Sequence, residues 1–438
     1  MLNRFFDLAA KGTTVRTEVL AGFTTFLTMA YIIAVNPAIL SQTGMPVAGV
    51  AAATCFCAAF ASILMGLVAN YPLALAPGMG LNAYFTYTVV LGMGVSWRVA
   101  LGCVFLSGLG FLFLTLVGLR RLIVEAIPKQ LFAALSGGIG LFIALIGLKS
   151  ANIIVNSPVL GLALGDLTKP SVCVALFGLM VMAALEIRRI KGAVLIGILA
   201  STGLALLIGA TRLSFSAYDL SALSATAFQL DIPGALGLKG GKAIGLFEIV
   251  FIFLFVDVFD NIGTLAAVTK RAGLTAPDGS IPRLNRILAA DSAAALVGAM
   301  AGTSTVVSYV ESAAGVSVGG RTGLTAIVVG LLFLAAAFVA PLAQIIPAAA
   351  TAPALIMVGA MMMMPLAEIE WKNPLLALPA FLTFALIPLT YSIANGLAAG
   401  VTSMAVLKLV AGRLKRSDAL LVGLAVLFVL RFVYLGSH

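Results

Sequence analysis

The sequence predicts an all-α polytopic membrane protein, and three observations support this fold class. The chain of 438 residues is 62% hydrophobic and only 10% charged, whereas a soluble domain carries about 25% charged residues. Its mean hydropathy is +1.16. Apolar runs near the ~20 residues that a helix needs to cross a bilayer follow one another over almost the whole length. The ten-residue alternating strands of a membrane β-barrel are not present in the sequence.

The apolar runs fall into two sets of seven. An odd number per set places the sets in opposite orientations, the inverted-repeat plan common among secondary transporters. We therefore expect about 14 transmembrane segments, in repeats that cover residues 12–210 and 243–412, joined by an extracytoplasmic loop at 211–242. Residues 413–438 add one C-terminal hydrophobic helix, which crosses the bilayer or lies along its interface. The predicted spans are residues 17–40, 46–69, 73–93, 97–118, 130–148, 170–187, 191–210, 243–268, 286–302, 305–320, 322–341, 347–365, 374–391 and 394–411.

Basic residues cluster in every second gap between the predicted spans, and this placement predicts the topology. Loops that stay in the cytoplasm carry an excess of Lys and Arg, so we expect a cytoplasmic N-terminus in the inner (plasma) membrane. Topology also explains the net charge of +10, and no nucleic-acid partner is expected. The clusters are residues 120–121, 188–191, 270–271, 283–286 and 413–416.

The third span of each set, the third and the tenth overall, is predicted to be broken by a short extended segment. Residues 76–83 contain a proline and two glycines, which disfavour a continuous helix. Residues 303–310 are rich in β-branched side chains, which favour extended backbone. Matching interruptions in the two halves of a transporter point to its substrate site.

Glu311 follows the second interruption inside a long apolar tract. An ionisable side chain at bilayer depth costs at least ~2.5–3.5 kcal/mol on insertion scales and indicates function by default. We interpret Glu311 as a group that accepts hydrogen bonds from a substrate N–H or cycles a proton. The alternative is that it only caps the following helix, a role that Ser308 or Ser312 fills without the charge.

Asp257 and Asp260 interrupt another apolar span and, three residues apart, share a helical face with Thr264. Aromatic residues surround them, as in a cavity wall that stacks a flat ring. Two neighbouring carboxylates are coupled in their protonation, so one of them can carry a proton. We favour Asp260 as the working acid, while the alternative for Asp257 is a place in a solvated vestibule.

Asp291 and Asn82 are further candidates with two readings each. Asp291 serves as a second proton site or a brace for the broken span, or it forms a structural ion pair with Arg286. Asn82 follows the turn expected at Gly80. Its amide both donates and accepts hydrogen bonds, so it can bind a ring nitrogen or a carbonyl group of the substrate. The alternative for Asn82 is a helix cap.

The expected cavity offers carboxylates, an amide, hydroxyl groups and aromatic rings, without Lys or Arg. This chemistry disfavours a strongly anionic substrate and fits a flat, neutral, N–H-rich solute. The sequence has no ATP-binding motif, so a proton gradient is expected to drive transport. No cofactor or metal is expected, since the four cysteines lie in apolar runs and the one histidine is residue 438.

Five motifs, several of them long and specific, resemble the signatures of purine nucleobase permeases. On these motifs the chain resembles the AzgA-like branch of the nucleobase/cation symporter-2 group, also called nucleobase–ascorbate transporters, over residues 12–412. The motifs lie at residues 22–31, 76–85, 259–265, 309–316 and 319–325.

The resemblance implies a seven-plus-seven fold divided into a core domain and a gate domain. It implies that the extended segments of the third and tenth spans pair near the membrane midplane, with the nucleobase between them and the eighth span. The family's eighth-span acid falls on Asp260 and its tenth-span acid on Glu311. The ninth-span acid falls on Asp291 and the third-span polar residue on Asn82. Asn261 departs from the pattern, which has a small hydroxyl residue beside the ring.

The resemblance also implies import of adenine, guanine or hypoxanthine together with protons, often by dimers. We therefore expect a proton-driven purine importer with elevator-like movement of the core domain, and not an enzyme. The alternatives are an anion transporter or exchanger on the same architecture, a xanthine/uracil-type carrier, and a non-transporting membrane protein. The predicted site comprises Asn82, Asp260, Thr264, Glu311 and Ser312 for substrate binding, Asp260, Asp291 and Glu311 for proton coupling, and Asp257, Asn261 and Gly80 as secondary candidates.

Overall fold

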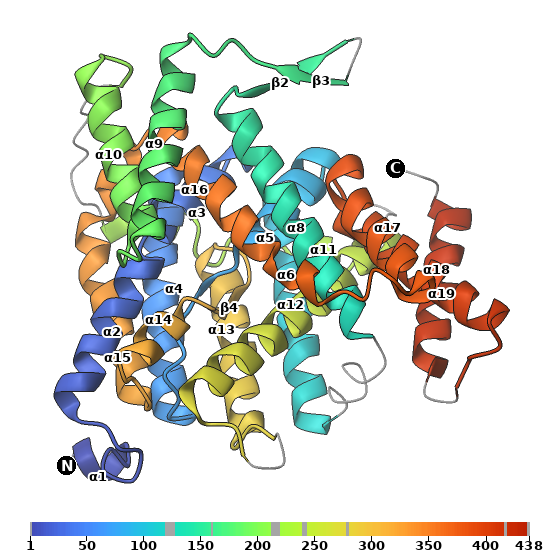
Figure 1. Cartoon of the computed structure of the whole chain (residues 1–438), viewed down its shortest axis with the longest axis horizontal. Coiled ribbons are helices and arrows are strands. Elements are labelled where there is room, and N and C mark those ends of the chain that lie inside the picture. The colour runs from blue at the N-terminus through green and yellow to red at the C-terminus, as the bar shows by residue number, and fades with distance from the viewer. Residues whose placement is uncertain are drawn as a thin grey trace.

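The computed structural model is a bundle of helices with two very short sheets (Figure 1). It describes residues 2–118, 128–158, 161–211, 220–238, 243–276, 280–415 and 418–435. The described elements are α1 (Leu2–Phe5), α2 (Val15–Met29), α3 (Ile32–Leu40), η1 (Ser41–Thr43), α4 (Val47–Val68), β1 (Leu75–Pro77), α5 (Met79–Ala83), η2 (Tyr84–Gly92), α6 (Trp97–Val117), α8 (Lys129–Ser150), β2 (Ile154–Ser157), β3 (Gly161–Leu164), α9 (Pro170–Ile187), α10 (Ala193–Leu207), η3 (Leu220–Ala225), α11 (Ile232–Ala235), α12 (Ala243–Ala272), α13 (Leu284–Ala301), β4 (Val306–Ser308), α14 (Ser312–Ser317), α15 (Gly323–Ala336), η4 (Ala337–Ile345), α16 (Ala348–Met362), η5 (Met364–Glu368), α17 (Pro374–Thr390), α18 (Ile393–Val410) and α19 (Ala419–Leu435).

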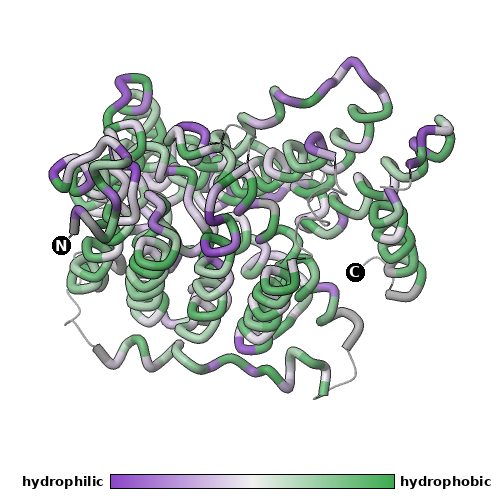
Figure 2. Tube along the Cα trace, turned by 90° about the horizontal axis from the view of Figure 1, so that it is seen from below, coloured by the Kyte–Doolittle hydropathy of each residue, from purple (hydrophilic) through white to green (hydrophobic). Residues whose placement is uncertain are grey.

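Within these residues, ten helices are long and apolar enough to cross a membrane. Shorter apolar helices occur in α10, α17 and α19. The helices are mainly hydrophobic along their length, while hydrophilic residues gather at the loops and helix ends (Figure 2). These helices confirm the prediction of a mostly helical, multi-pass membrane protein.

Polar caps fix several helix ends. Helix α2 begins after Thr14, whose hydroxyl accepts the N–H of Thr17 at 3.2 Å, and α6 begins after Ser96, which accepts the N–H of Val99 at 3.4 Å. Such caps satisfy N–H groups that have no partner within the helix. Helix α6 ends at Gly118 with a φ of 75°, the left-handed conformation that glycine adopts without strain.

The two most extensive helix pairs, α8–α16 and α4–α15, bring backbones into direct contact. A Cβ atom on Gly323 of α15 would collide with the backbone of Gly66 on α4. A Cβ atom on Gly359 of α16 would collide with the carbonyl oxygen of Gly140 on α8. Lipid tails are as apolar as the side chains, so helices in a bilayer associate through such close packing.

Two short strands, β1 and β4, pair antiparallel in the interior of the bundle (Figure 1). Their register places Leu75 opposite Ser308 and Pro77 opposite Val306, and all six strand residues are buried. Strand β4 lies inside the predicted interruption 303–310, whereas β1 overlaps only the first two residues of the predicted interruption 76–83, most of which forms α5. Helix α5 follows β1 closely, and α14 follows β4 after one turn.

Two regions outside the spans have structure that hydropathy does not indicate. Strands β2 and β3 form a hairpin that projects from one end of the molecule (Figure 1). The predicted loop 211–242 contains η3 and α11, and it folds back on α13: Thr226 donates to the carbonyl of Ala301 at 3.1 Å. Residues 212–219 and 239–242 of this loop lie outside the described residues.

Candidate functional site

Side chains from several helices converge on the β1–β4 pair. Tyr309 ties the two strands together, because its hydroxyl donates to the carbonyl of Pro77 at 2.5 Å and its N–H donates to the carbonyl of Ala74 at 2.9 Å. Gly78 donates its N–H to the carbonyl of Thr305 at 2.9 Å. The two interrupted segments, more than 200 residues apart in sequence, are thereby held in one place.

Glu311 lies at the start of α14 and is partly exposed. Its carboxylate makes no capping hydrogen bond to the helix. Instead, the hydroxyl of Tyr31, at the break between α2 and α3, donates to Glu311 Oε1 at 2.8 Å. The structure therefore does not support the alternative in which Glu311 is only a helix cap.

Asp260 is exposed in the middle of α12, although Asp257, Asn261 and Thr264 on the same helix are buried. It lies within electrostatic range of Glu311, the residue before α14, and α12 packs against both α14 and β4. The structure thus brings together the two acids that the sequence analysis ranked highest, and both have accessible surface.

The accessible surface at Asp260 continues along one face of α12. Gly263, Ala267 and Lys270 are exposed at intervals of three or four residues, as expected for one helical face. A Cβ atom on Gly263 would meet no other atom within 4 Å. This open stripe runs from Asp260 to the basic C-terminal end of the helix.

Behind the strands, Asn261 is a hub between α12, α13 and β4. Its amide nitrogen donates to Asp291 and, at 3.3 Å, to Asp257, while its oxygen accepts the N–H of Ser308 at 3.3 Å. Asp291 also accepts the Ser308 hydroxyl at 3.0 Å. All four residues are buried.

These contacts correct two expectations. Asp257 is only 1% exposed, so the vestibule alternative for it is wrong. Asn261 is fully buried and its side chain joins the hub behind β4, which does not favour the expected position beside a bound ring. For Asp291, the hydrogen bonds favour the role of a brace for the broken span.

Asn82 belongs to a second buried cluster. Its amide nitrogen donates to Asn36 Oδ1 at 2.5 Å, and the Asn36 amide donates to Thr54 at 2.7 Å and to Thr303 at 2.9 Å. Asn82 Oδ1 is buried without a hydrogen-bond partner in the described part of the chain. Helix α5 is capped by Gly78 and Asn82 lies inside it, so the capping alternative for Asn82 is wrong.

Of the remaining predicted residues, Ser312 and Gly80 lie close to other elements, and Thr264 is nearly buried. Ser312 is fully buried, and its hydroxyl accepts the N–H of Ala74 at 3.0 Å. Thr264 is 8% exposed. A Cβ atom on Gly80 would lie 2.9 Å from the side chain of Ile139, which shows how closely α5 approaches α8.

The sequence analysis missed three polar residues of this region. Tyr31 and Asn36 contact the site directly, and the only signal for Tyr31 was its place at the end of the first quoted motif, residues 22–31. The third is Glu18, which is fully buried. Its carboxylate accepts the N–H of Arg321 at 2.8 Å and the hydroxyl of Thr325 at 2.5 Å, which fixes the segment between α14 and α15.

The chain is similar to several known permeases over its full length. A putative permease of Methanocaldococcus jannaschii is 48% identical over 437 residues, covering 100% of this chain and 99% of that protein. Adenine permease AdeP of Escherichia coli (strain K12) is 44% identical over 438 residues, covering 100% and 97%. Guanine/hypoxanthine permease PbuG of Bacillus subtilis (strain 168) is 41% identical over 447 residues, covering 99% and 100%.

Solved structures share the fold at low sequence identity. The transmembrane domain of the cyanobacterial bicarbonate transporter BicA matches with a TM-score of 0.66 at 15% identity, covering 88% of this chain and 97% of that chain. The murine anion transporter Slc26a9 matches with a TM-score of 0.64 at 12% identity, covering 90% and 68%.

The family comparison covers nearly the whole molecule. Residues 16–428 match the permease family, so the match includes the β1–β4 pair and both accessible acids. Together with the full-length relatives above 40% identity, this shows that the chain belongs to the permease family, the nucleobase/cation symporter-2 group that its motifs predicted, whose members are transporters and not enzymes.

Proposed function

We propose that the chain is a proton-coupled carrier that imports purine nucleobases. The observation that carries the proposal is the exposed Asp260 in the middle of an apolar helix, within electrostatic range of Glu311 and beside two broken spans. Full-length relatives named adenine permease and guanine/hypoxanthine permease support a purine as the substrate.

The chemistry of the site suits a flat, neutral base. Carboxylates accept hydrogen bonds and do not donate them when ionised, so Asp260 and Glu311 would bind the N–H groups of the ring system. The free acceptor of Asn82 suits a further N–H, once the substrate or a water molecule reaches it. Thr264 and Ser312 would adjoin the ring.

Asp260 and Glu311 would also carry the coupled proton. Two acids that interact electrostatically share a proton more readily than two isolated ones. Protonation of one acid would permit movement of the loaded carrier, and release of the proton on the inner side would reset it. We assign Asp291 to support of this pair, because its carboxylate holds Asn261 and Ser308 in place.

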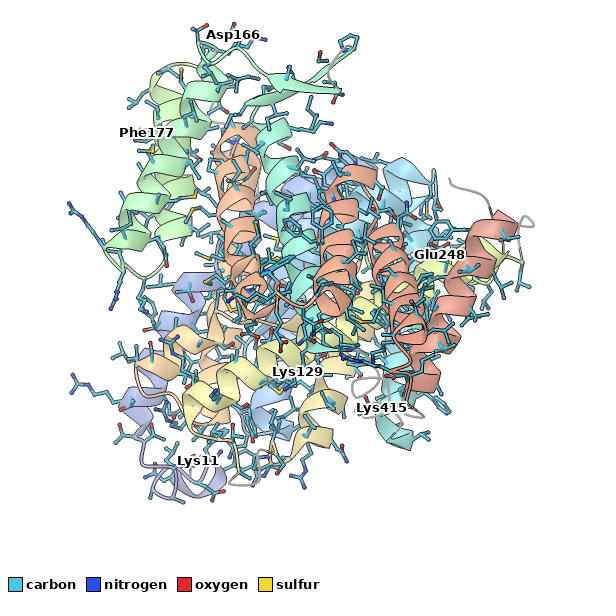
Figure 3. All side chains as sticks on the ribbon, turned by 45° about the vertical axis from the view of Figure 1, so that its right-hand side comes forward. Lys11, Lys129, Asp166, Phe177, Glu248 and Lys415 are labelled. Atoms are coloured by element: carbon cyan, nitrogen blue, oxygen red, sulfur yellow. The ribbon has the colours of Figure 1, made fainter. Side chains whose placement is uncertain are left out.

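The proposed architecture is a seven-plus-seven inverted repeat with 14 spans, at residues 12–210 and 243–412, in which an elevator-like core moves against a gate. Residues 211–242 would lie outside the cytoplasm and 413–438 would form the additional helix. Lys11, Lys129 and Lys415 lie away from the end that carries Asp166 (Figure 3), which supports a cytoplasmic N-terminus. A homodimer in the inner (plasma) membrane is the proposed assembly, driven by the proton gradient without a cofactor.

Uptake of labelled hypoxanthine by cells that express the chain tests the proposal. We expect Asp260→Asn and Glu311→Gln each to abolish uptake while the protein remains in the membrane. Asp166→Asn, at an exposed acid remote from the site, is the matched control and should transport normally. Normal uptake by both site variants would refute the assignment.

Competition experiments separate the rival substrates. Unlabelled adenine, guanine, xanthine and uracil should be compared as competitors, and a xanthine/uracil-type carrier would respond to the last two. The anion alternative follows the fold of the solved structures, but the side chains whose hydrogen bonds are described around the β1–β4 pair are acids, Tyr, Asn, Thr and Ser, with no Lys or Arg side chain among them. Chloride or sulfate flux through the purified protein would support that alternative instead.

A further inference from the structure

An open apolar groove lies between helices α18 and α19, and the proposed transport site does not use it. These helices lie at the opposite side of the molecule from α9 and α10 (Figure 1). The groove has a volume of about 330 Å³. We call it the α18–α19 groove and define it by Ala405 and Leu409 on α18, Val422, Val426 and Val429 on α19, and Leu414 between the helices.

The lining residues show that the groove runs along both helices. Ala405 and Leu409 are four residues apart on α18, and Val422, Val426 and Val429 follow the same helical spacing on α19. Aliphatic side chains dominate the lining. The groove is therefore an elongated slot that ends at Leu414.

The groove is open along one side, since Leu409 is 65% exposed and Val426 is 52% exposed. Its lining consists almost entirely of aliphatic side chains. A hydrocarbon chain has no polar group and therefore matches this lining.

Charge beside the groove indicates which lipid headgroup is preferred. Arg413 and Lys415 directly flank Leu414, and both are exposed. The neighbouring acid, Asp418, already pairs with Lys408 at 2.7 Å. Positive charge is therefore in excess where the slot ends, and both Arg and Lys bind phosphate groups.

We propose that the α18–α19 groove binds one anionic phospholipid, with an acyl chain between the helices and the phosphate against Arg413 and Lys415. Lipid tails are as apolar as leucine, so burial of the chain alone does not distinguish one lipid from another. Each basic residue at a membrane surface favours an anionic headgroup about fivefold, and the two together about thirtyfold. This site is independent of the transported substrate.

Native mass spectrometry of the purified, delipidated full-length protein tests the headgroup. Phosphatidylglycerol and phosphatidylcholine with identical acyl chains are added in competition, and phosphatidylglycerol should be preferred about thirtyfold. The double variant R413Q/K415Q should bring the two lipids close to parity. R188Q/K191Q removes two exposed charges between α9 and α10 and should leave the preference unchanged.

A groove-filling variant tests the acyl chain. Val426 lines the groove and is 52% exposed, whereas the adjacent Leu427 is 62% exposed and does not line it. V426W should abolish the bound phosphatidylglycerol and L427W should retain it. Equal binding of both lipids by the parent protein, or retention of the lipid by V426W, would overturn the proposal. Loss of a dimer mass in V426W would also overturn it, because a second copy of the chain would then be the occupant.

Discussion

Replacement of Tyr31 by phenylalanine isolates the contribution of a single hydroxyl group to the proposed site. Tyr31 lies where α2 gives way to α3, and its hydroxyl donates to one carboxylate oxygen of Glu311 at 2.8 Å. The hydroxyl orients the carboxylate and leaves its second oxygen available. We expect Tyr31→Phe to weaken purine binding because the carboxylate then loses this fixed orientation.

The magnitude follows from the burial of Tyr31. The side chain is 2% exposed, and phenylalanine fills the same space, so the loss is restricted to one hydrogen bond. A hydrogen bond to a charged group contributes about 1.5–3 kcal/mol. This energy is the upper limit for the effect on binding, so at about 1.4 kcal/mol for each factor of ten the dissociation constant should rise by at most roughly 10- to 150-fold.

Equilibrium binding of labelled hypoxanthine or adenine to the purified protein measures this effect without the transport cycle. Tyr71→Phe is the matched control, because the Tyr71 hydroxyl donates to the carbonyl of Pro282 at a similar distance, 2.8 Å, and has no contact with Glu311. An unchanged dissociation constant in Tyr31→Phe would refute the reasoning. An equal loss in Tyr71→Phe would show that the effect is a general destabilisation.

Three further predictions concern packing, a buried charge and access. Gly323→Ala should yield little folded protein by size-exclusion chromatography, because its Cβ collides with the backbone of α4, while Gly203→Ala, with open space around it, should behave as the parent. Glu18→Gln should lower the free energy of unfolding by about 1.5–3 kcal/mol, since it weakens charge-assisted hydrogen bonds, whereas the exposed Glu186→Gln should not change the unfolding temperature. Gly263→Leu should slow uptake because it narrows the exposed face of α12 along which substrate would reach Asp260, while the purified protein still binds purine. An uptake rate equal to that of the parent would contradict this access role.

The membrane-spanning helices were readable from sequence because hydropathy and length determine them. The predicted span 46–69 corresponds to α4 at Val47–Val68, and the predicted span 170–187 corresponds to α9 at Pro170–Ile187. The β2–β3 hairpin was not predicted, since eight residues outside an apolar run give no comparable signal. The register of β1 on β4 was also beyond the sequence, because pairing between distant segments depends on the three-dimensional packing around them.

The acids of the candidate site were found because a charge in an apolar run is conspicuous. Their neutral partners were not found. A tyrosine in a membrane span is usually interpreted as an interfacial residue, and nothing local in the sequence indicates that Tyr31 reaches Glu311, 280 residues away. Asn36 was missed for the same reason, although it links Asn82 to Thr303.

The polar residues around the broken spans divide into two groups with different physical roles. A break in a helix leaves backbone N–H groups without partners, and inside a bilayer each of these must be satisfied by protein. The N–H groups of Ala74, Leu75 and Ser308 donate to side-chain oxygens of residues on other elements, and not to backbone carbonyls within a helix. Most polar residues near the strands are therefore needed to support the break itself.

Residues that support the break must therefore be distinguished from residues that contact the substrate. Ser312 and Asn261 accept two of those N–H groups, so the loss of transport in a variant at either position would not by itself show contact with substrate. Asp260 and Glu311 differ, because they have accessible surface and support no strand N–H among the contacts described. A variant that removes substrate contact should spare the unfolding temperature, whereas a variant that removes support should lower it. Measuring binding and unfolding on the same protein therefore separates the two groups, and we expect variants of Asp260 and Glu311, unlike those of Ser312 and Asn261, to affect binding alone.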